Sequence, residues 1–350
     1  MKIAIVGGGP GGLYLAILLK KSAPDRTVRV YERNRADDTF GFGVVFSDAT
    51  LDNIREADPE SYAAISASFA HWDDIDVHYQ GRCLRSTGHG FAGLSRKRLL
   101  QILQNRCLEL GVDLQFESSV DSYADLDWAD VVVAADGLNS QLRKEFANDL
   151  KPRVDARPNR FTWLGTKRQF PAFTFYFKEN EHGLWRVHAY NFEDGLSTFI
   201  VETTEDGWRK SGMDAASEAE TAAYCEALFA EELEGHSLLT NRSIWRQFPT
   251  VTCEHWSHGK LVLLGDCAHT AHFSIGSGTK LAMEDAIALA QALDASPTVS
   301  DAYQAYESER KSQVDSTQRA AQVSLEWFEN TELLFNRLEP EQFAFSLLTR

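Results

Sequence analysis

Positive charge is scarce in this 350-residue sequence, because 35 Lys and Arg stand against 51 Asp and Glu and leave a formal net charge of −16 at pH 7. Such an excess of negative charge repels nucleic-acid phosphates and anionic lipid headgroups. Long apolar runs are also lacking, and none reaches the roughly 20 residues that a membrane-spanning helix needs. The sequence therefore argues against nucleic acid or a membrane as a partner.

Cysteine is rare as well, and no two cysteines form a C-x-x-C pair or combine with histidine at a zinc-site spacing. These absences argue against a disulfide-stapled scaffold, predict no metal site and are typical of a reducing compartment. An apolar strand begins at residue 2, which leaves no room for a signal peptide, so we expect a cytoplasmic protein. The cysteines are Cys83, Cys107, Cys225, Cys253 and Cys267.

The sequence opens with a glycine-rich turn between two apolar runs. Residues 2–6 are predicted to form a strand and residues 13–19 part of a helix, while Gly7, Gly9 and Gly12 fit the pattern G-x-G-x-x-G. In this pattern glycine permits a tight turn, close approach of the backbone to a pyrophosphate, and packing of helix on strand. The positive end of the helix then faces the phosphates. The pattern predicts a dinucleotide-binding unit.

A second apolar run, residues 28–32, ends in an acid where a dinucleotide needs one. Glu32 lies twenty residues after Gly12, a spacing at which a carboxylate accepts a hydrogen bond from the adenosine ribose. Arg33 follows it as a further candidate contact. A surface role for Glu32 and a glycine turn without a ligand are the alternatives, but strand, turn, helix, second strand and acid all agree.

The remaining pattern predicts an α/β protein of two lobes. Apolar strands at residues 131–135 and 260–264 alternate with helices, as in a doubly wound sheet. Between them, aromatic and β-branched runs separated by turns predict an antiparallel sheet. We therefore expect a discontinuous Rossmann-like dinucleotide-binding domain, an inserted antiparallel β-sheet substrate domain and C-terminal helices. The expected boundaries are residues 1–150, 151–254, 255–300 and 301–350.

A second segment indicates which dinucleotide binds. After the strand at 260–264, Asp266 stands where a carboxylate accepts a hydrogen bond from a ribityl hydroxyl, and a loop then leads into a helix. The positive end of that helix favours the negative charge of a reduced flavin ring by about 0.3–1 kcal/mol. Nicotinamide has no such need, so FAD is the expected cofactor. The loop and the helix start contribute Gly276, Ser277, Gly278 and Thr279.

Three motifs carry a resemblance to a known family. Residues 7–12, the segment 135–143 and the pair Gly265-Asp266 resemble, in order and spacing, the signatures of the group A FAD-dependent aromatic monooxygenases, the 4-hydroxybenzoate hydroxylase-like family. Within that family the chain is most similar to salicylyl-CoA 5-hydroxylases and to the monooxygenase half of 2-aminobenzoyl-CoA monooxygenase/reductase. This likeness rests on residues 42–48, 71–74 and 272–280.

The sequence departs from the wider family at two positions. Most relatives carry proline and asparagine where this chain has Phe273 and Lys280. The departure fits the acyl-CoA subgroup and also a violacein-pathway hydroxylase of a tryptophan-derived indole. The resemblance implies FAD, with NADH or NADPH as the transient reductant and O2 as co-substrate. It also implies that Arg96 contacts the FAD phosphates and that Asp136 lies near the pyrophosphate, where it orders backbone N–H groups or Arg143.

The reaction that the resemblance implies is hydroxylation of an aromatic ring, with an aryl-CoA thioester as the substrate. The candidates are 5-hydroxylation of salicylyl-CoA to gentisyl-CoA and a reaction of 2-aminobenzoyl-CoA. A hydroxyl or amino group ortho to the thioester activates C5, which lies para to it. A tryptophan-derived indole is the alternative substrate, and a non-oxygenating flavin reductase is the alternative from another class. The aromatic sheet, which would form a roomy apolar site, favours the hydroxylase.

Candidate catalytic residues are His188, His272 and Tyr190, whose side chains are able to polarise a ring hydroxyl or accept its proton. His188 lies in an alternating strand that leaves open whether it faces the flavin or water, and His272 adjoins the flavin loop. Three aromatic residues are candidates for a slot around the substrate, although aromatic residues most often build cores. They are Phe42, Trp72 and Phe273.

A polyanionic CoA group needs a local basic site in a chain of this net charge. The segment from residue 151 to 168 holds six cations and a single acid, and within it Arg157 and Arg160 are the candidate phosphate ligands. The alternative is a basic, solvated edge of the sheet.

Overall fold

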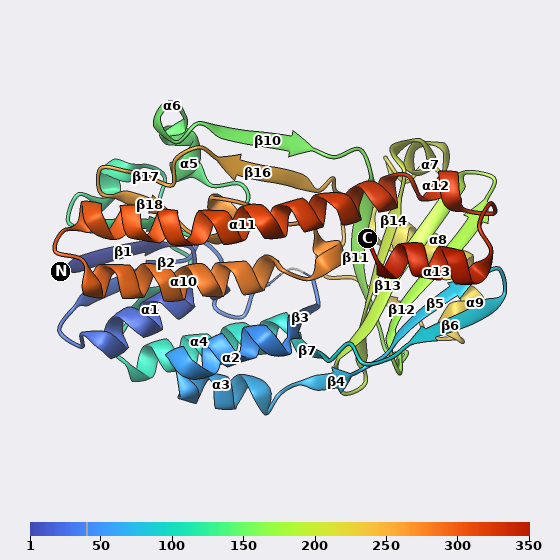
Figure 1. Cartoon of the computed structure of the whole chain (residues 1–350), viewed down its shortest axis with the longest axis horizontal. Helices are drawn as coiled ribbons and strands as arrows, with labels where there is room; N and C mark the ends of the chain where they lie inside the picture. Colours follow the sequence, from blue (N-terminus) through green and yellow to red (C-terminus); the bar gives the residue numbers. More distant parts are fainter. Residues whose placement is uncertain (40) are drawn as a thin grey trace.

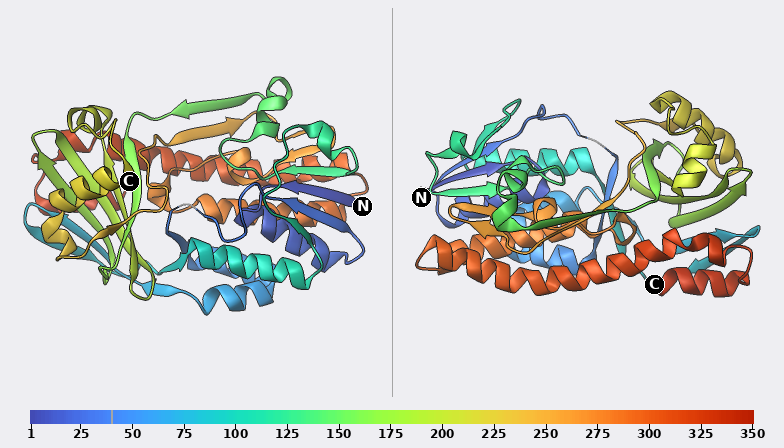
Figure 2. Two further views of the ribbon diagram at one scale, coloured as in Figure 1. Left: turned by 180° about the vertical axis from the view of Figure 1, so that it is seen from behind. Right: turned by 90° about the horizontal axis from the view of Figure 1, so that it is seen from above.

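The computed structural model describes residues 1–39 and 41–350, and Figure 1 shows two lobes side by side. One lobe holds helices around a mostly parallel sheet, and the other is built on a larger, mostly antiparallel sheet. The helix α11 (Val299–Glu329) runs along both lobes, as the view from above in Figure 2 also shows. None of the helices in these two ranges combines the length and the apolar character that crossing a bilayer requires.

Six strands form the sheet of the first lobe, in the order β17-β18-β9-β1-β2-β8. All neighbours are parallel except β17 and β18. Strand β9 is buried along its whole length, as a parallel strand with both faces covered must be. This is the expected Rossmann-like arrangement. The strands are β1 (Lys2–Val6), β2 (Thr27–Tyr31), β8 (Asp113–Gln115), β9 (Val131–Ala134), β17 (Ser257–His258) and β18 (Leu261–Leu263).

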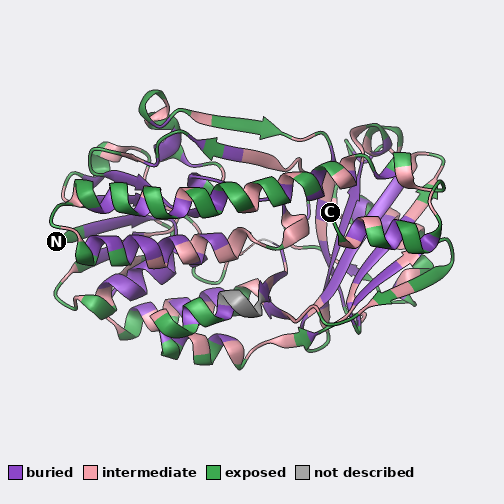
Figure 3. Cartoon of the chain, viewed as in Figure 1, coloured by how far each residue is buried: buried purple, intermediate pink, exposed green. Residues whose placement is uncertain are grey.

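Helices pack on this sheet. The first of them, α1 (Pro10–Ser22), is buried from Pro10 to Leu19 and contacts both α4 (Arg96–Glu109) and α10 (Gly278–Ala295). Figure 3 shows α1 and α10 largely in the buried colour, whereas the outward face of α11 is exposed. These two helices, which follow the glycine turn and the loop of residues 274–277, are therefore held by extensive apolar packing.

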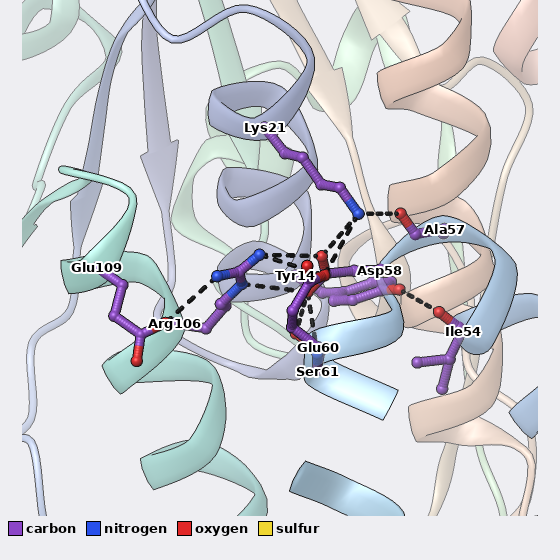
Figure 4. A network of polar contacts seen from close by, with 9 residues as sticks. All are labelled: Tyr14, Lys21, Ile54, Ala57, Asp58, Glu60, Ser61, Arg106 and Glu109. Carbon is purple, nitrogen blue, oxygen red and sulfur yellow. Dashed lines mark hydrogen bonds and ion pairs between the residues drawn. The ribbon is translucent and has the colours of Figure 1, made fainter. Parts of the chain in front are cut away.

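A buried carboxylate ties α1, α3 and α4 together (Figure 4). Asp58 caps α3 (Pro59–Ser66) by accepting a hydrogen bond from Ser61 N at 3.1 Å. It also binds Lys21 Nζ of α1 at 2.9 Å and Arg106 Nη2 of α4 at 3.3 Å. Burial opposes ionisation, but the hydrogen bonds from Lys21, Ser61 and Arg106 outweigh it and hold the pKa of the Asp58 carboxyl well below its usual range.

The second lobe is built on a seven-stranded sheet, in the order β15-β11-β14-β13-β12-β5-β6. Its neighbours are antiparallel except β12 and β5. Helices α8 (Glu218–Leu228) and α9 (Ala230–Leu233) cover the outer face, and the end of α11 with α13 (Pro340–Leu348) covers part of the inner face. The strands are β15 (Leu238–Leu239), β11 (Arg160–Thr166), β14 (Leu196–Thr203), β13 (Gly183–Glu193), β12 (Phe173–Asn180), β5 (Ile75–Tyr79) and β6 (Arg82–Ser86).

Two strands lie on the other side of the expected boundary at residue 150. Strands β5 and β6 precede it in the sequence but belong to the second sheet, because Val77 and Tyr79 pack with Phe175 and Phe343 in one buried cluster. Strands β5 and β12 pair in parallel. Parallel neighbours need a long connection, and here the chain between them passes through the other lobe. The first segment of the chain therefore contributes a hairpin to the second sheet.

Two small sheets complete the fold. In one, β7 pairs with β3 and β4, and in the other β10 pairs with β16 as a ribbon that links the lobes (Figure 2). These strands are β3 (Gly43–Ser47), β4 (Ala70–Trp72), β7 (Phe91–Ser95), β10 (Pro152–Ala156) and β16 (Pro249–Cys253). The remaining helices are α2 (Asp48–Ala57), α5 (Gln141–Glu145), α6 (Ala147–Leu150), α7 (Glu205–Lys210) and α12 (Thr331–Leu334), with 3-10 turns η1 (Tyr123–Leu126), η2 (Gly265–Cys267) and η3 (Phe273–Ile275).

Candidate functional site

The glycines of the first turn have different reasons to be glycine. A Cβ at Gly7 would lie 2.1 Å from Ala135 O, and one at Gly12 would lie 2.2 Å from Gly7 O, so the fold itself requires both. A Cβ at Gly9 would meet no atom within 4 Å, and the backbone there has an ordinary φ of −76°. The space beside Gly9 is thus open, at the very start of α1.

Glu32 is held against this turn. Its Oε2 accepts a hydrogen bond from Gly8 N at 2.9 Å, and its Oε1 accepts one from Asn34 N at 2.8 Å. The carboxylate is half-buried, while the neighbouring Arg33 is exposed. The acid predicted from the spacing therefore lies directly beside the glycine turn.

Asp136 joins the turn after β9 to the turn after β18. Its Oδ2 accepts a hydrogen bond from Gln141 N at 2.8 Å, and its Oδ1 accepts one from Cys267 Sγ at 3.0 Å. Arg143 instead donates to backbone carbonyls, including Cys267 O at 2.9 Å. Asp136 was expected to order either backbone N–H groups or Arg143, and in the structure it binds the backbone N–H of Gln141. Both turns lie at the carboxyl ends of parallel strands, where such sheets bind ligands.

Asp266 and Arg96 come together from distant parts of the sequence. Asp266 is solvent-exposed, yet the protein around it is dense enough to raise the pKa of its carboxyl, an effect that His269 and Arg96 oppose. Burial lowers the pKa of Arg96, the first residue of α4, and Asp266 opposes that shift.

The loop of residues 274–277 leads into α10, and no side chain caps the start of this helix. The turn of this loop closes at Gly276, whose φ of +64° is left-handed, and α10 begins at Gly278. A Cβ at Gly278 would meet no atom within 4 Å. Ser277 makes no capping hydrogen bond, and the same holds for Gly9 at the start of α1, whereas α4, α8 and α11 have side-chain caps. Thr279 follows in the first turn and is half-buried.

These features fit a flavin dinucleotide. Two helices present uncapped N-termini, which leave backbone N–H groups and positive dipole ends for anionic groups. Gly9 and Gly278 leave open space at those two ends. Glu32, which the sequence predicts to bind the ribose, lies beside the first turn, and Asp266, which it predicts to bind the ribityl chain, lies near Arg96.

Strand register places three rows of side chains on the inner face of the second sheet. The cross-strand partners are Phe161, Glu202 and Arg186 in the first row; Trp163, Ile200 and His188 in the middle row; and Gly165, Thr198 and Tyr190 in the third. Because successive residues of a strand alternate in direction, these nine residues share one face. The strand pattern left open whether His188 faces the flavin side or water, and the register places it on the inner face.

Two of the candidate aromatic residues stand at opposite ends of these rows. The ring of Phe273 lies 4.7 Å from that of Phe161 and 5.4 Å from that of His188. A Cβ at Gly165 would lie 2.6 Å from the ring of Phe42, which therefore sits over the third row. The middle row lies between them; His188 in this row is only 1% exposed, whereas Trp163 is half-buried.

The candidate catalytic side chains are all buried. Burial lowers the pKa of His188, with Glu202 opposing it, and lowers the pKa of His272 to about 3, so both rings are neutral at pH 7. His188 Nε2 lies 3.4 Å from Glu202 Oε2. Tyr190 donates from its hydroxyl to Gly43 O at 3.1 Å, and burial raises its pKa.

Trp72 supports this corner of the site. Its ring stacks on Tyr190 with the centroids 5.8 Å apart and lies 6.2 Å from Phe91. Trp72 is buried and joins Tyr190 and Phe192 in one apolar cluster. The side chain therefore packs behind Tyr190 as part of a core.

Most cations of the basic segment are paired with acids that lie far away in the sequence, and Arg157 also pairs with Asp155 at 2.9 Å. Arg157 donates to Glu329 through two hydrogen bonds, of 3.0 and 2.6 Å. Arg160 lies 3.2 Å from Glu205, and its guanidinium stacks over Trp208 at 4.5 Å. Further ion pairs join Lys151 to Glu254 and Arg168 to Glu234. Arg153 and Lys167 are exposed and form no ion pair within the described residues.

Glu202 and Arg186 are not among the site residues predicted from the sequence, and both are fully buried on the inner face. A signal for both exists, because each is a charged residue within a strand of apolar neighbours, and such residues are rarely buried without a partner. What the sequence does not show is which other charges they meet.

One other cluster has ligand atoms close together. Asp76, His78 and Cys83 bring theirs within 4.8 Å of one another. Both carboxylate oxygens of Asp76, however, accept hydrogen bonds from Arg85 at 2.7 Å. Because that guanidinium already occupies the carboxylate, the group is a poor metal ligand.

Comparison with known proteins agrees with this geometry. An FAD binding domain family matches residues 128–321, and an NAD(P)-binding Rossmann-like domain family matches residues 5–41. The chain is 48% identical to salicyloyl-CoA 5-hydroxylase of Streptomyces sp over 360 aligned positions, which cover 100% of this chain and 70% of that protein. It is 36% identical to 3-hydroxy-4-methyl-anthranilyl-[aryl-carrier protein] 5-monooxygenase of Streptosporangium sibiricum, over 94% of this chain and 89% of that protein.

A solved structure shares the fold. The oxygenase of 2-methyl-3-hydroxypyridine-5-carboxylic acid superposes with a TM-score of 0.77 at 19% identity, covering 96% of this chain and 93% of that one. The identity to the two monooxygenases over nearly the whole chain decides the family. The chain belongs to the FAD-dependent aromatic monooxygenases, with FAD as its cofactor and NAD(P)H as the reductant.

Proposed function

We propose that this protein hydroxylates the ring of an aryl-CoA thioester, with salicylyl-CoA as the substrate and C5 as the position attacked. The observation that carries the proposal is the 48% identity, over the full length of this chain, to an enzyme named for that reaction. The second relative is named as a 5-monooxygenase of an anthranilyl group on an aryl-carrier protein, and an anthranilyl ring is likewise ortho-substituted. 2-Aminobenzoyl-CoA is therefore the second substrate to test.

The cofactor would lie across the first lobe, with its pyrophosphate at α1 and its ring at α10. Open space at Gly9 and Gly278 and the uncapped helix starts support this placement. When bound and reduced by NAD(P)H, FAD supplies an activated oxygen atom from O2. The proposed contacts are Gly7, Gly9, Gly12, Glu32, Arg33, Arg96, Asp136, Asp266, Gly276, Ser277, Gly278 and Thr279.

The substrate ring would lie over the middle row, between Phe42 and Phe273. Because His188 is only 1% exposed and Phe273 and Phe328 lie against its ring, a substrate ring would reach it only after Phe273 turns aside. The apolar walls then exclude water from the reacting carbon. Trp72 supports the slot from behind, through its stacking on Tyr190.

The chain's own contribution to the chemistry is to position the ring and to move one proton. Neutral His188 would accept the proton of the ring hydroxyl, which increases electron density at C5, the position para to that oxygen. His272 is also neutral, and its Nδ1 accepts a hydrogen bond from Ser274 N at 3.4 Å, so it would hold the loop beside the substrate. Tyr190 keeps its proton and would anchor the backbone next to Phe42.

Phosphate binding by Arg157 and Arg160 would require an exchange of partners. Both guanidiniums already bind carboxylates, Glu329 and Glu205, so the CoA phosphates would have to replace these. Arg153 and Lys167 are exposed, and they could bind phosphate without first giving up a carboxylate partner among the described residues. The proposal therefore assigns the phosphates to the whole segment 151–168.

Two further proposals concern organisation and location. The FAD-binding domain would comprise residues 1–150 and 255–300, with 151–254 as the substrate domain and 301–350 as the C-terminal helices, apart from the hairpin of β5 and β6. A cytoplasmic location is supported by the use of NAD(P)H, a metabolite of that compartment.

A substrate panel tests the proposed function. Purified holoenzyme is given salicylyl-CoA, 2-aminobenzoyl-CoA, the two free acids, and tryptophan, and NAD(P)H oxidation is measured together with product mass. We expect salicylyl-CoA to yield one added oxygen per NAD(P)H consumed, and the free acids to yield little product. Product from a free acid at the same rate would contradict thioester recognition. Release of peroxide without any hydroxylated product would favour a non-oxygenating flavoprotein.

A further inference from the structure

We propose that Glu202 is a positioning residue, which orients His188 and stabilises the positive charge that His188 gains on taking the ring-hydroxyl proton. The proton leaves the ring oxygen for an imidazole nitrogen, and the electron pair of the O–H bond stays on the oxygen. This inference rests on the proposed function, because it deepens the role given there to His188. The role assigned to Glu202 is exerted through His188, although Glu202 also lines a small cavity with His272 and Phe273.

The contacts of Glu202 define how it acts. The side chain projects from β14 next to His188 of β13, with Oε2 at 3.4 Å from His188 Nε2. Asn159 Nδ2 donates to Oε1 at 2.6 Å, and Arg186 Nη2 lies 3.9 Å away. Burial opposes the charge, but Arg186 and His188 lower the pKa of Glu202 to about 2, so the carboxylate stays ionised.

An ionised carboxylate fixes the tautomer of its partner. Because Glu202 only accepts hydrogen bonds, the proton of neutral His188 lies on Nε2, and the lone pair lies on Nδ1. The same contact restricts rotation of the ring. A base whose free lone pair has one direction is better placed to receive a proton than one that flips.

The surrounding charges make Glu202 necessary for a protonated His188. Arg186 lies on the same strand, and Arg350, which follows α13, stacks over Phe328 at 4.9 Å. Both guanidiniums lower the pKa of His188, and Glu202 raises it. His272 is neutral and Arg157 is paired with Glu329, while Glu332 acts on Arg186 from an exposed position. Without Glu202, an imidazolium would therefore face the buried Arg186 and the half-buried Arg350 and would lose the carboxylate that contacts it.

The decisive variant is Glu202→Gln, which keeps the shape of the side chain and removes its charge. Turnover of salicylyl-CoA by the holoenzyme should fall by about tenfold or more, while KM changes by less than about threefold, as expected when a step of proton transfer is weakened. The acid limb of the pH profile of kcat/KM should move to lower pH, because His188 becomes a weaker base. In the absence of NAD(P)H, ultraviolet absorbance should show a smaller ionised fraction of bound salicylyl-CoA.

Two further variants keep the test decisive. Glu193→Gln removes an exposed acid from β13, the strand of His188, and should match the unmodified enzyme in every readout. Asn159→Ala removes the amide that withdraws charge from Glu202, so the acid limb should move in the opposite direction, to higher pH. This variant decides the matter if Glu202→Gln yields no folded protein.

The outcomes separate this inference from the function on which it rests. Loss of stability in Glu202→Gln with an unmoved acid limb and an unchanged ionised fraction would mean a purely structural carboxylate and would overturn the proposal. The same holds for an Asn159→Ala limb that stays in place or moves to lower pH. Failure of the proposed function would appear differently, as no product from any aryl-CoA thioester with the unmodified enzyme.

Discussion

The fold does not require glycine at position 9, so a substitution there tests ligand binding apart from folding. A Cβ at this position meets nothing, whereas a Cβ at Gly12 collides with Gly7 O at 2.2 Å. Gly9→Val should therefore fold with a urea midpoint close to that of the unmodified apoprotein, but bind FAD at least about tenfold more weakly, because the new side chain occupies the space beside a helix N-terminus. Flavin absorbance at fixed protein concentration measures the occupancy. Gly12→Ala is the matched control and should lose stability. Full flavin occupancy in Gly9→Val would place the pyrophosphate elsewhere.

The neutral histidines predict how stability depends on pH. His188 and His272 have lowered pKa values in the folded protein, that of His272 about 3, whereas an unfolded histidine titrates near about 6.5. Below about pH 6.5 the unfolded state binds more protons, so the free energy of unfolding should fall as pH falls, by up to about 1.4 kcal/mol per pH unit for each histidine. Urea denaturation at several values from pH 7 to about pH 5 stays above the main titration range of unfolded carboxyls.

Replacing one histidine at a time shows which residue causes the pH dependence of the free energy of unfolding. His272→Gln should remove one histidine's share of the pH dependence, because glutamine does not titrate. His255→Gln, a change to an exposed histidine, is the control and should leave the dependence as it was. An unchanged slope in His272→Gln would contradict a neutral, buried ring at this position.

At the scale of elements, Asp58 is the point where three helices meet. Asp58→Ala removes the cap of α3 and leaves Lys21 and Arg106 without their shared carboxylate, so we expect a loss of about 2–4 kcal/mol in the free energy of unfolding. Chemical denaturation of the FAD-free protein measures this. Asp52→Ala, which breaks an exposed ion pair with Arg55, should cost less than about 1 kcal/mol. Equal effects of the two substitutions would show that the Asp58 contacts contribute no more than a surface pair.

Strands differ in how far the sequence predicts them. The runs that became β11 to β14 are long, apolar and bounded by turns, so their alternation was sufficient to identify them. Strands β5 and β6 are short and stand within the first segment of the chain, where the surrounding pattern favours helices and a parallel sheet. Their place is set by packing against Phe175 and Phe343, and neither residue is near them in sequence.

At the scale of the whole molecule, the net charge of −16 makes salt a test of how a CoA thioester is held. If the segment 151–168 attracts the phosphates, KM for salicylyl-CoA should rise between about 0.05 and 0.3 M salt, because the attraction is screened within roughly 10 Å. The double variant Arg153→Gln/Lys167→Gln should raise KM, reduce that salt dependence and leave kcat unchanged. The corresponding Arg157→Gln/Arg160→Gln variant should do the same if those residues exchange partners. A KM that falls as salt rises would mean that the overall negative charge dominates.

The sequence by itself determined the local features of this protein. The glycine turn, the acid at Glu32 and the strand alternation follow from steric and hydrogen-bonding needs that act within a few residues or at a fixed spacing. Tertiary structure alone decided which charges meet. Arg157 binds Glu329, which lies 172 residues away in the sequence, and His188 contacts Glu202 on the neighbouring strand. The physical reason is that a Coulomb interaction depends on distance in space and on burial, and neither is written in the order of residues.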